Sequence, residues 1–324
     1  MTTIDATLRH ALELSGPDLI LTLDPALQGL PETAHGGSVL AVFDTLGGVT
    51  VPREVSGLYR RRVPLGVPLT LRRSHEDSTA SFVLSDQSDA VLVEGRVAAL
   101  ATNVADDSLS RSGEGGTALR GPVLSGLPRP AAASPASRAT ASVVPAEPSR
   151  PRPTDSDDAG RYLLPVSRAC FACGTDNELG LRAQLAFDAD TVRGTWQPRA
   201  PFRRADGTLA PAALTTLVDE AAFWLGALAT GESGMTTELR VALHRPAPFE
   251  APVTVSGARA GVRPRPDDAR YQDTEIVARA GGQVVATARI TFVAVRGAAR
   301  RLVSGMLAIN DPESVRRVFP AYTR

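Results

Sequence analysis

One arrangement of segments occurs twice in this sequence: an apolar stretch with helical spacing, followed by four stretches that alternate as β-strands do. The apolar stretch covers residues 36–46 in the first half and about 210–229 in the second. The predicted strands lie near 54–62, 67–74, 79–85 and 90–100, and again near 235–245, 251–261, 270–280 and 283–296. A helix followed by antiparallel strands, used twice, predicts an α+β fold.

The composition changes between the two copies. Residues 104–160 are rich in Ala, Pro, Ser, Gly and Arg and contain no aromatic residue and no Ile. Such a segment cannot bury enough apolar surface to offset the entropy of ordering it, so we predict a disordered linker. The predicted domains are therefore 1–103 and 161–297. A tail over 298–324 follows, with a short helix capped by Asp311.

Length and charge exclude several classes of protein. The 324 residues suffice for two domains with their own cores, and 43% hydrophobic with 22% charged residues is typical of a soluble globular protein. The 35 basic residues, all Arg, balance 35 acidic residues, which argues against nucleic-acid binding. The first residues have no pattern of a secretory signal, and no run approaches a membrane span. We expect a cytoplasmic protein with no membrane partner.

The start of the first apolar helix points to chemistry. His35, Gly36 and Gly37 open it, and Asp44 lies inside its apolar run. The first N–H groups of a helix have no acceptor within the helix and attract anions, whereas a buried carboxylate needs a partner or a ligand. An acid and an anion-stabilising helix start are common parts of acyl-transfer sites. Asp219 occupies the position in the second helix that matches Asp44 in the first.

Three groups of residues resemble the hotdog-fold acyl-CoA thioesterases, in their tandem or double-hotdog form. The first is the His-Gly-Gly start and acid within 35–44. The second is CFACGTDNELGL over 170–181, similar to the opening motif of many phenylacetate-pathway-like members. The third combines 217–221 with 238–246, similar to the end of the central helix and the strand after it. The resemblance covers the chain except for its linker and tail.

The resemblance implies two hotdog domains, each an antiparallel sheet wrapped around a central helix, packed as an intrachain pseudo-dimer. It implies hydrolysis of an acyl-CoA or carrier-bound acyl thioester at the interface of the halves. There the N–H of Gly36 would polarise the thioester carbonyl, and Asp219 or Glu220 would act as base or nucleophile. A second site would use Asp44, but Pro211 stands at the position of Gly36 and has no N–H to donate. One intact site is therefore expected.

Other residues receive supporting roles in this interpretation. His35 is expected to hold the loop before the helix through a hydrogen bond, and Thr237 to orient water. Gly37, Arg61 and Arg62 are expected near the coenzyme A portion of the substrate, where guanidinium groups would bind phosphate. Arginines also protect sheet edges, so this role stays open. No separate cofactor is expected, and a homodimer of pseudo-dimers is left open.

Cys170 and Cys173 form a lone CxxC pair. A structural zinc site needs four ligands and no second pair exists, while a thioredoxin-like context for a redox pair is missing. A structural turn shaped by Asn177 and Gly180 is the favoured interpretation. The spacing of the histidines indicates no metal site.

The His-Gly-Gly start is absent from the second helix, which leaves a second function open. In this alternative the protein binds an acyl ligand or serves assembly on the same scaffold without catalysis. The acids at 219–220 would then belong to the exposed side of a helix. A dehydratase or hydratase ranks last, because neither Asp-x-Asn-Pro-x-His nor His-Phe-Pro occurs in the sequence.

Overall fold

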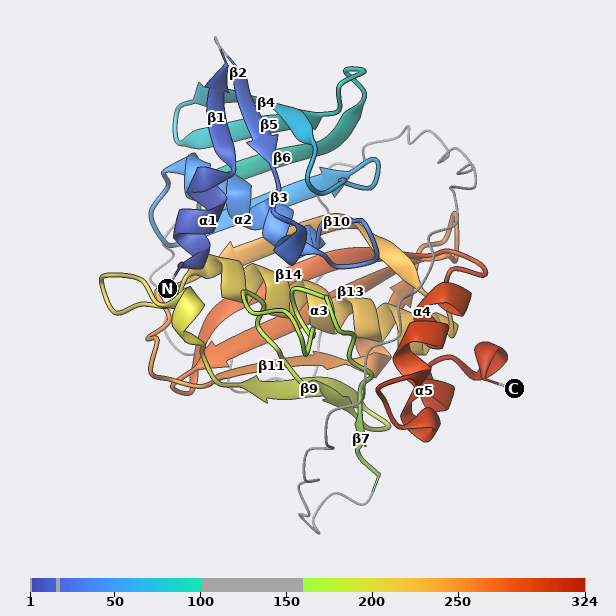
Figure 1. Ribbon diagram of the computed structural model, residues 1–324. Helices are drawn as coiled ribbons and strands as arrows, with labels where there is room; N and C mark the ends of the chain where they lie inside the picture. The colour runs from blue at the N-terminus through green and yellow to red at the C-terminus, as the bar shows by residue number, and fades with distance from the viewer. Residues whose placement is uncertain (1, 16–17, 101–159, 324) are drawn as a thin grey trace. The chain divides into compact units, whose positions relative to one another are not determined.

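The two predicted central helices each lie against part of one antiparallel sheet (Figure 1). The computed structural model describes residues 2–15, 18–100 and 160–323, so the predicted linker over 104–160 lies outside the described residues except for Gly160. The first half contains α1 (Ile4–His10), β1 (Leu12–Ser15), β2 (Asp18–Thr22), η1 (Pro25–Leu27), α2 (Gly36–Gly47), β3 (Arg53–Tyr59), β4 (Pro68–Glu76), β5 (Thr79–Ser85) and β6 (Val91–Ala99).

The second half has the same plan with additions at both ends. Its elements are β7 (Tyr162–Leu163), β8 (Ala186–Phe187), β9 (Thr191–Trp196), η3 (Ala200–Phe202), α3 (Pro211–Thr230), β10 (Gly234–Leu243), β11 (Val253–Ala258), η4 (Arg259–Gly261), β12 (Arg263–Pro264), β13 (Tyr271–Ala280), β14 (Gln283–Ala294), α4 (Ala299–Leu307), α5 (Pro312–Val318) and η5 (Pro320–Tyr322). Strands β7 to β9 and helix α4 were not expected from the sequence. Helix α1 ends at His10, and the chain turns into β1 after Ala11.

The strands of the two halves form one continuous sheet in the described part of the chain. Its order is β1-β2-β4-β5-β6-β3-β10-β14-β13-β11-β9-β8-β7, with β12 paired to β13. The halves meet where β3 pairs with β10 in antiparallel register, with Arg53 opposite Leu243 and Leu58 opposite Glu238. Because backbone hydrogen bonds cross this junction, both halves belong to one compact unit.

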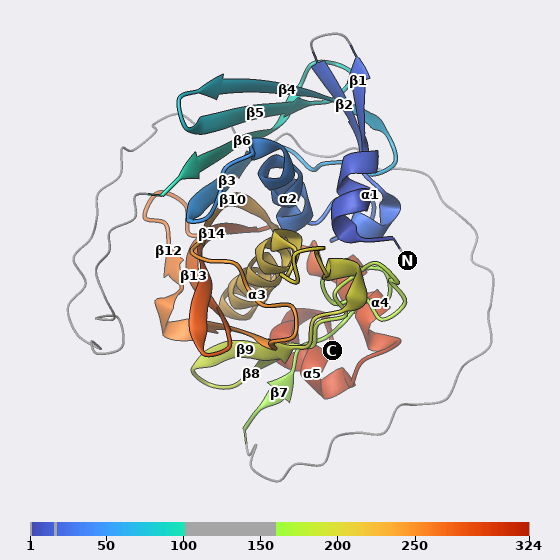
Figure 2. The ribbon, with the colours of Figure 1, turned by 90° about the vertical axis from the view of Figure 1, so that its left-hand side faces the viewer.

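Helices α2 and α3 are buried because they are apolar on nearly every side. They lie on the same side of the sheet and contact each other (Figure 2). Among the described helices, α3 is long and apolar enough by composition to cross a membrane. However, 83% of its most apolar window is buried inside the protein. Its apolar surface therefore packs within the core.

Glycine allows each central helix to lie close to its strands. In the first half a Cβ at Gly95 would overlap the ring of Phe43, which stacks on Phe82 with 5.1 Å between ring centroids. In the second half the positions are exchanged: a Cβ at Gly226 of α3 would overlap Phe292 of β14. In both halves an aromatic ring thus packs directly against the backbone of a glycine.

The crossing of α2 and α3 depends on another glycine. A Cβ at Gly37 would lie 2.5 Å from the carbonyl oxygen of Thr215 and 2.6 Å from the Cα of Thr216, closer than real atoms approach. The hydroxyl of Thr215 donates to the carbonyl of Gly37 at 2.8 Å. The two helices therefore approach each other backbone to backbone, and a side chain at this position would push them apart.

The tail folds back onto the second half. Asn310 holds it there, since its amide accepts from the N–H of Val166 at 2.7 Å and donates to the Val166 carbonyl at 2.8 Å. The helix expected after Asp311 is α5, and the Asp311 carboxylate accepts from the N–H of Ser314. Helix α4 precedes it and turns Val303 and Met306 into the core.

A pair of helical glycines tests this packing. Glycine to alanine in a helix normally stabilises a protein by about 1 kcal/mol. We expect that gain for Gly305→Ala in α4, where an added Cβ meets nothing within 4 Å. Gly226→Ala should instead destabilise the protein by about 1–3 kcal/mol, because the Phe292 ring has to move. Urea unfolding of both variants measures the difference, and a gain at both positions would contradict the packing.

Candidate active site

A cavity lies where the start of α2, the middle of α3 and the start of β10 meet. Its volume is about 100 Å³. Besides Gly36, its lining includes polar side chains from both halves of the chain: Thr33, His35, Tyr59, Arg61, Arg62, Ser167, Cys170, Cys173, Asp219, Glu220 and Thr236. Apolar side chains complete the wall, among them Phe223, Trp224 and, from the tail helix α4, Leu302 and Met306. No pattern in the sequence had indicated that the tail lies at this place.

His35 is the N-cap of α2 and lies between two acids of α3. Its backbone N–H donates to the Leu27 carbonyl at 2.8 Å, which fixes the loop before the helix. Its Nδ1 is 3.1 Å from Oδ2 of Asp219, and its Nε2 is 3.4 Å from Oε2 of Glu220. All three side chains are buried. His35 thus holds the loop, as expected, and its side chain also contacts both acids.

Asp219 receives donors from both halves of the chain. Its Oδ2 accepts from the N–H of Gly37 at 2.8 Å, and its Oδ1 accepts from the hydroxyl of Thr236 at 2.6 Å. Burial alone would raise the pKa of Asp219, but the hydrogen bond and charge of His35, with these two donors, hold that pKa below its ordinary value. The Asp219 carboxylate is therefore ionised at neutral pH.

The surroundings of His35 decide where its protons lie. Burial lowers the pKa of His35, but the carboxylates of Asp219 and Glu220 outweigh it and raise that pKa well above its ordinary value. The N–H of Gly37 points at both Nδ1 of His35, at 3.2 Å, and Oδ2 of Asp219, at 2.8 Å. A protonated Nδ1 cannot accept, so the carboxylate is the acceptor and His35 donates to it as well.

Gly36 brings the helix start against the acid. A Cβ at Gly36 would lie 2.7 Å from Oδ2 of Asp219, so no other residue fits without moving the carboxylate. As the first residue of α2, Gly36 has no acceptor for its N–H within the helix, and it lines the cavity. The phenol of Tyr59 donates to the Gly36 carbonyl at 2.6 Å, and burial raises the pKa of Tyr59 well above its ordinary value.

Glu220 lies beside the same cavity but makes different contacts. Its Oε1 accepts from the indole N–H of Trp224 at 2.8 Å, while its Oε2 faces His35. Of the two acids proposed for catalysis, Asp219 is thus the one that lies against Gly36. The Trp224 contact spans one helical turn, a spacing that the sequence would have allowed us to find.

Thr237, which was expected to orient water, is not among the residues that line the cavity. Its hydroxyl donates to the carbonyl of Thr291 at 3.2 Å, and the neighbouring Thr236 holds the acid instead. The reason is a bulge in β10, where the register with β14 shifts between Thr236 and Glu238. A bulge reverses the faces that the following side chains occupy, and this is not visible in a simple strand alternation.

Asp44 is also placed elsewhere than expected. Its two carboxylate oxygens accept from Nε and Nη2 of Arg53 at 2.5 and 2.6 Å, and both side chains are buried. Asp44 is not among the residues that line the cavity. Because this carboxylate does not line the cavity and pairs with a permanent cation, the catalytic role assigned to Asp44 is corrected to a structural ion pair with Arg53.

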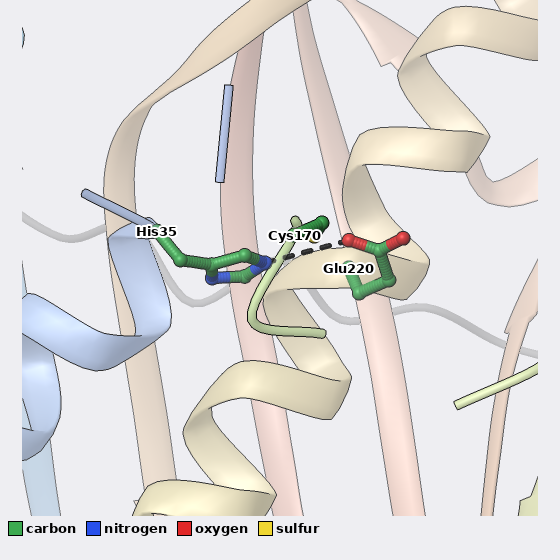
Figure 3. Close-up of side chains that lie close together, drawn as sticks. All are labelled: His35, Cys170 and Glu220. Atoms are coloured by element: carbon green, nitrogen blue, oxygen red, sulfur yellow. Dashed lines mark hydrogen bonds and ion pairs between the residues drawn. The ribbon is translucent and has the colours of Figure 1, made fainter. Parts of the chain in front are cut away.

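Cys170 and Cys173 lie in the cavity wall, both buried and both as free thiols. The expected turn is present: the amide of Asn177 donates to the Ala169 carbonyl and its oxygen accepts from the N–H of Gly180. The thiols contact each other, and the hydrogen bond from Cys173 lowers the pKa of Cys170. Figure 3 shows that Cys170 lies beside His35 and Glu220.

Arg61 and Arg62 follow β3 and lie at the mouth of the cavity, where both are exposed. They also line a second, more open groove beside Glu32 and Asp86. Gly37, expected near the coenzyme A portion of a substrate, instead donates to Asp219 and packs against α3. Sequence reasoning missed Tyr59 and Thr236, whose partners lie far away along the chain.

The Asp44–Arg53 pair provides a test of stability. We expect Asp44→Asn to lower the free energy of unfolding by about 3 kcal/mol, because it leaves the Arg53 guanidinium buried without its counter-charge. The double variant Asp44→Leu/Arg53→Met removes both charges and should recover most of that loss. Urea unfolding measures all three proteins. An Asp44→Asn protein as stable as wild type would show that the pair is exposed to water.

The fold has counterparts among solved structures. It is similar to a proposed thioesterase II from Thermobifida fusca YX, with a TM-score of 0.54, 16% identity, and coverage of 91% of this chain and 100% of that chain. It is similar to a conserved protein of unknown function with hot dog fold from Alicyclobacillus acidocaldarius (TM-score 0.51, 12% identity, 90% and 97% covered). The tesB protein of Mycobacterium avium subs paratuberculosis gives a TM-score of 0.51 and 11% identity, with 90% and 98% covered.

No protein-family model matches the chain, and no curated protein matches it. At these identities the likeness to solved structures concerns the fold. The expectation of an α+β fold with a large antiparallel sheet is confirmed, and the described residues have the hotdog fold of these proteins.

Proposed function

We propose that this protein hydrolyses the thioester of an acyl-CoA or of a carrier-bound acyl group, at a site shared by the two halves of the chain. The observation that carries the proposal is the contact between Asp219 of one half and the helix start at Gly36 of the other. An ionised carboxylate and an N–H group without an acceptor in its helix face one buried cavity. These are the groups that thioester hydrolysis requires.

The proposed architecture is a double hotdog within one chain. Each half supplies one central helix, α2 or α3, and about half of the continuous sheet. The antiparallel pairing of β3 with β10 and the contact of α2 with α3 support a pseudo-dimer. In such a pair one active site can draw its helix start from one unit and its acid from the other.

The Gly36 N–H and the Asp219 carboxylate would have separate roles in the reaction. The Gly36 N–H would donate to the carbonyl oxygen as negative charge develops on it, an effect worth about 3 kcal/mol for single donors in other enzymes. Asp219 would either deprotonate a water molecule or attack the carbonyl carbon itself. The C–S bond then breaks, the sulfur leaves as a thiol after protonation, and water supplies the hydroxyl of the acid product. Thr236 and His35 would hold the Asp219 carboxylate in place.

The lining of the cavity suggests how the substrate lies. The side chains of Phe223, Leu302 and Met306 offer an apolar wall to an acyl group. Arg61 and Arg62 at the mouth are exposed and free to meet the phosphates of coenzyme A or of a carrier arm. The α4 helix would thus help to set the length of the acyl group.

A second candidate is acyl-ligand binding without hydrolysis. The observation that favours it is that both carboxylate oxygens of Asp219 already have partners. They accept hydrogen bonds from Gly37 and Thr236, and the carboxylate pairs with His35. A carboxylate with so many donors is a weaker base than a free one. The two candidates make opposite predictions for the release of free thiol.

The first test compares the two matching acids of the central helices. Wild-type protein incubated with a panel of acyl-CoAs should release free coenzyme A thiol for at least one acyl group. Asp219→Asn should reduce this rate by 10²-fold or more, in the range of a lost catalytic group. Asp44→Asn should keep the wild-type rate at a temperature where its folding has been verified. The assay is the absorbance of a thiol reagent.

Two results would contradict hydrolysis. Thiol release that survives Asp219→Asn would place the chemistry elsewhere. Acyl-CoA binding without any release, across the panel, would favour the binding protein.

A second test concerns the phosphates. The double variant Arg61→Ser/Arg62→Ser should raise KM for an acyl-CoA about tenfold, and should leave KM for the matching acyl-pantetheine, which has no phosphate, unchanged. Arg72→Ser/Arg73→Ser removes two strand arginines that do not line the cavity, and should change neither constant. An equal rise of KM for both substrates in the first variant would show that these arginines bind no phosphate.

A further inference from the structure

We infer that His35, Cys170 and Glu220 form a binding site for a divalent transition-metal ion of the Zn²⁺ class. One potential ligand atom from each residue lies within 4.8 Å of the other two, and all three residues are buried (Figure 3). The inference does not depend on hydrolysis, because a metal ion can bind whether or not the chain is an enzyme.

The distances suit a tetrahedral ion. Zinc bonds of 2.0–2.3 Å place neighbouring ligand atoms roughly 3.3–3.8 Å apart at the corners of a tetrahedron. Nε2 of His35 and Oε2 of Glu220 are 3.4 Å apart, which matches such an edge without movement. The remaining corner would face the cavity, which these residues line. Three protein ligands and one open position are typical of a catalytic rather than a structural zinc site.

The donor types restrict the ion. An imidazole nitrogen, a thiolate and a carboxylate oxygen suit zinc and its neighbours, whereas Mg²⁺ and Ca²⁺ favour oxygen ligands alone. On binding, the ion would replace the proton between Nε2 of His35 and Oε2 of Glu220, and a thiolate and a carboxylate would then face its two positive charges. The ion and its two anionic ligands would then carry no net charge among them, which lowers the cost of burying these three groups.

Each proposed ligand is held by a hydrogen bond, and for two of them this bond uses the atom that would not bind the metal. His35 contacts Asp219 through Nδ1, while its Nε2 faces Oε2 of Glu220, where the ion would lie between them. Glu220 accepts from Trp224 through Oε1 and leaves Oε2. The Cys170 sulfur accepts from the N–H of Ala172 at 3.3 Å. Carboxylate–histidine–metal chains and oriented carboxylates of this kind surround natural metal sites.

This arrangement also explains why sequence spacing indicated no metal site. The three ligands come from a loop before α2, from the loop over 170–181 and from α3, so no two of them form a local motif. Cys173, the partner in the CxxC pair, is not one of the three proposed ligands. The pair therefore contributes one ligand rather than two.

The test uses the full-length protein without an affinity tag, reduced and freed of metal by a chelator. Titration with Co²⁺ should give one bound ion per chain, with the ultraviolet charge-transfer band of a Co²⁺–thiolate bond, and Zn²⁺ should displace it. The wild-type titration alone can overturn the proposal: failure to bind one equivalent, or binding without the thiolate band, would do so.

The two neighbouring thiols provide matched variants. Cys170→Ser should abolish the band and weaken Zn²⁺ binding at least tenfold, while Cys173→Ser should keep both. Trp224→Phe removes the donor to Glu220 and should weaken Zn²⁺ binding about tenfold. Far-UV circular dichroism verifies that each variant is folded. Loss of the band in a folded Cys173→Ser protein would overturn the assigned ligands. Thiol release by the metal-free protein would leave the proposed hydrolysis standing whichever way these titrations turn out.

Discussion

The close approach of α2 and α3 at Gly37 is the contact on which the rest of this structure depends. With no side chain at that position, the two helix backbones come together, and Thr215 bridges them by donating to the Gly37 carbonyl. The N–H of the same glycine then reaches Asp219, one helical turn further along α3. A single absent Cβ thus positions both the helix start and the acid, and the sheet junction between β3 and β10 holds the two halves in that register.

The two matching acids show how surroundings decide the role of a carboxylate. Asp44 and Asp219 occupy equivalent places on buried helices, and each must be compensated because burial of a bare charge is costly. Asp44 meets Arg53, a permanent cation that takes both its oxygens. Asp219 meets His35, backbone N–H and hydroxyl donors at the wall of a cavity. The first arrangement closes the acid off from any ligand, and the second leaves it beside a space that a ligand can enter.

Local patterns in the sequence were sufficient for the central helices and for the strands that follow them, since helical and strand periodicities need only neighbouring residues. The pairing of Gly36 with Asp219 came instead from the resemblance to the hotdog-fold thioesterases. The patterns failed where the deciding partner is remote or irregular. The bulge in β10 brings Thr236 rather than Thr237 to the acid, and strands β7 and β8, with two residues each, are too brief to show a period. The role of Cys170 depends on residues from two other segments.

The two halves differ in the part of the candidate site that each supplies. Helix α2 begins with Gly36, whose N–H is available, whereas α3 begins with Pro211, which has none. Helix α3 keeps an acid that faces the cavity, whereas the acid of α2 is bound to Arg53. The available helix-start N–H and the acid that faces the cavity therefore come from different halves. A symmetric dimer must keep both parts in every subunit, because one sequence builds both sites. Once two units share a chain this constraint is lifted, and one half can supply the helix start while the other supplies the acid.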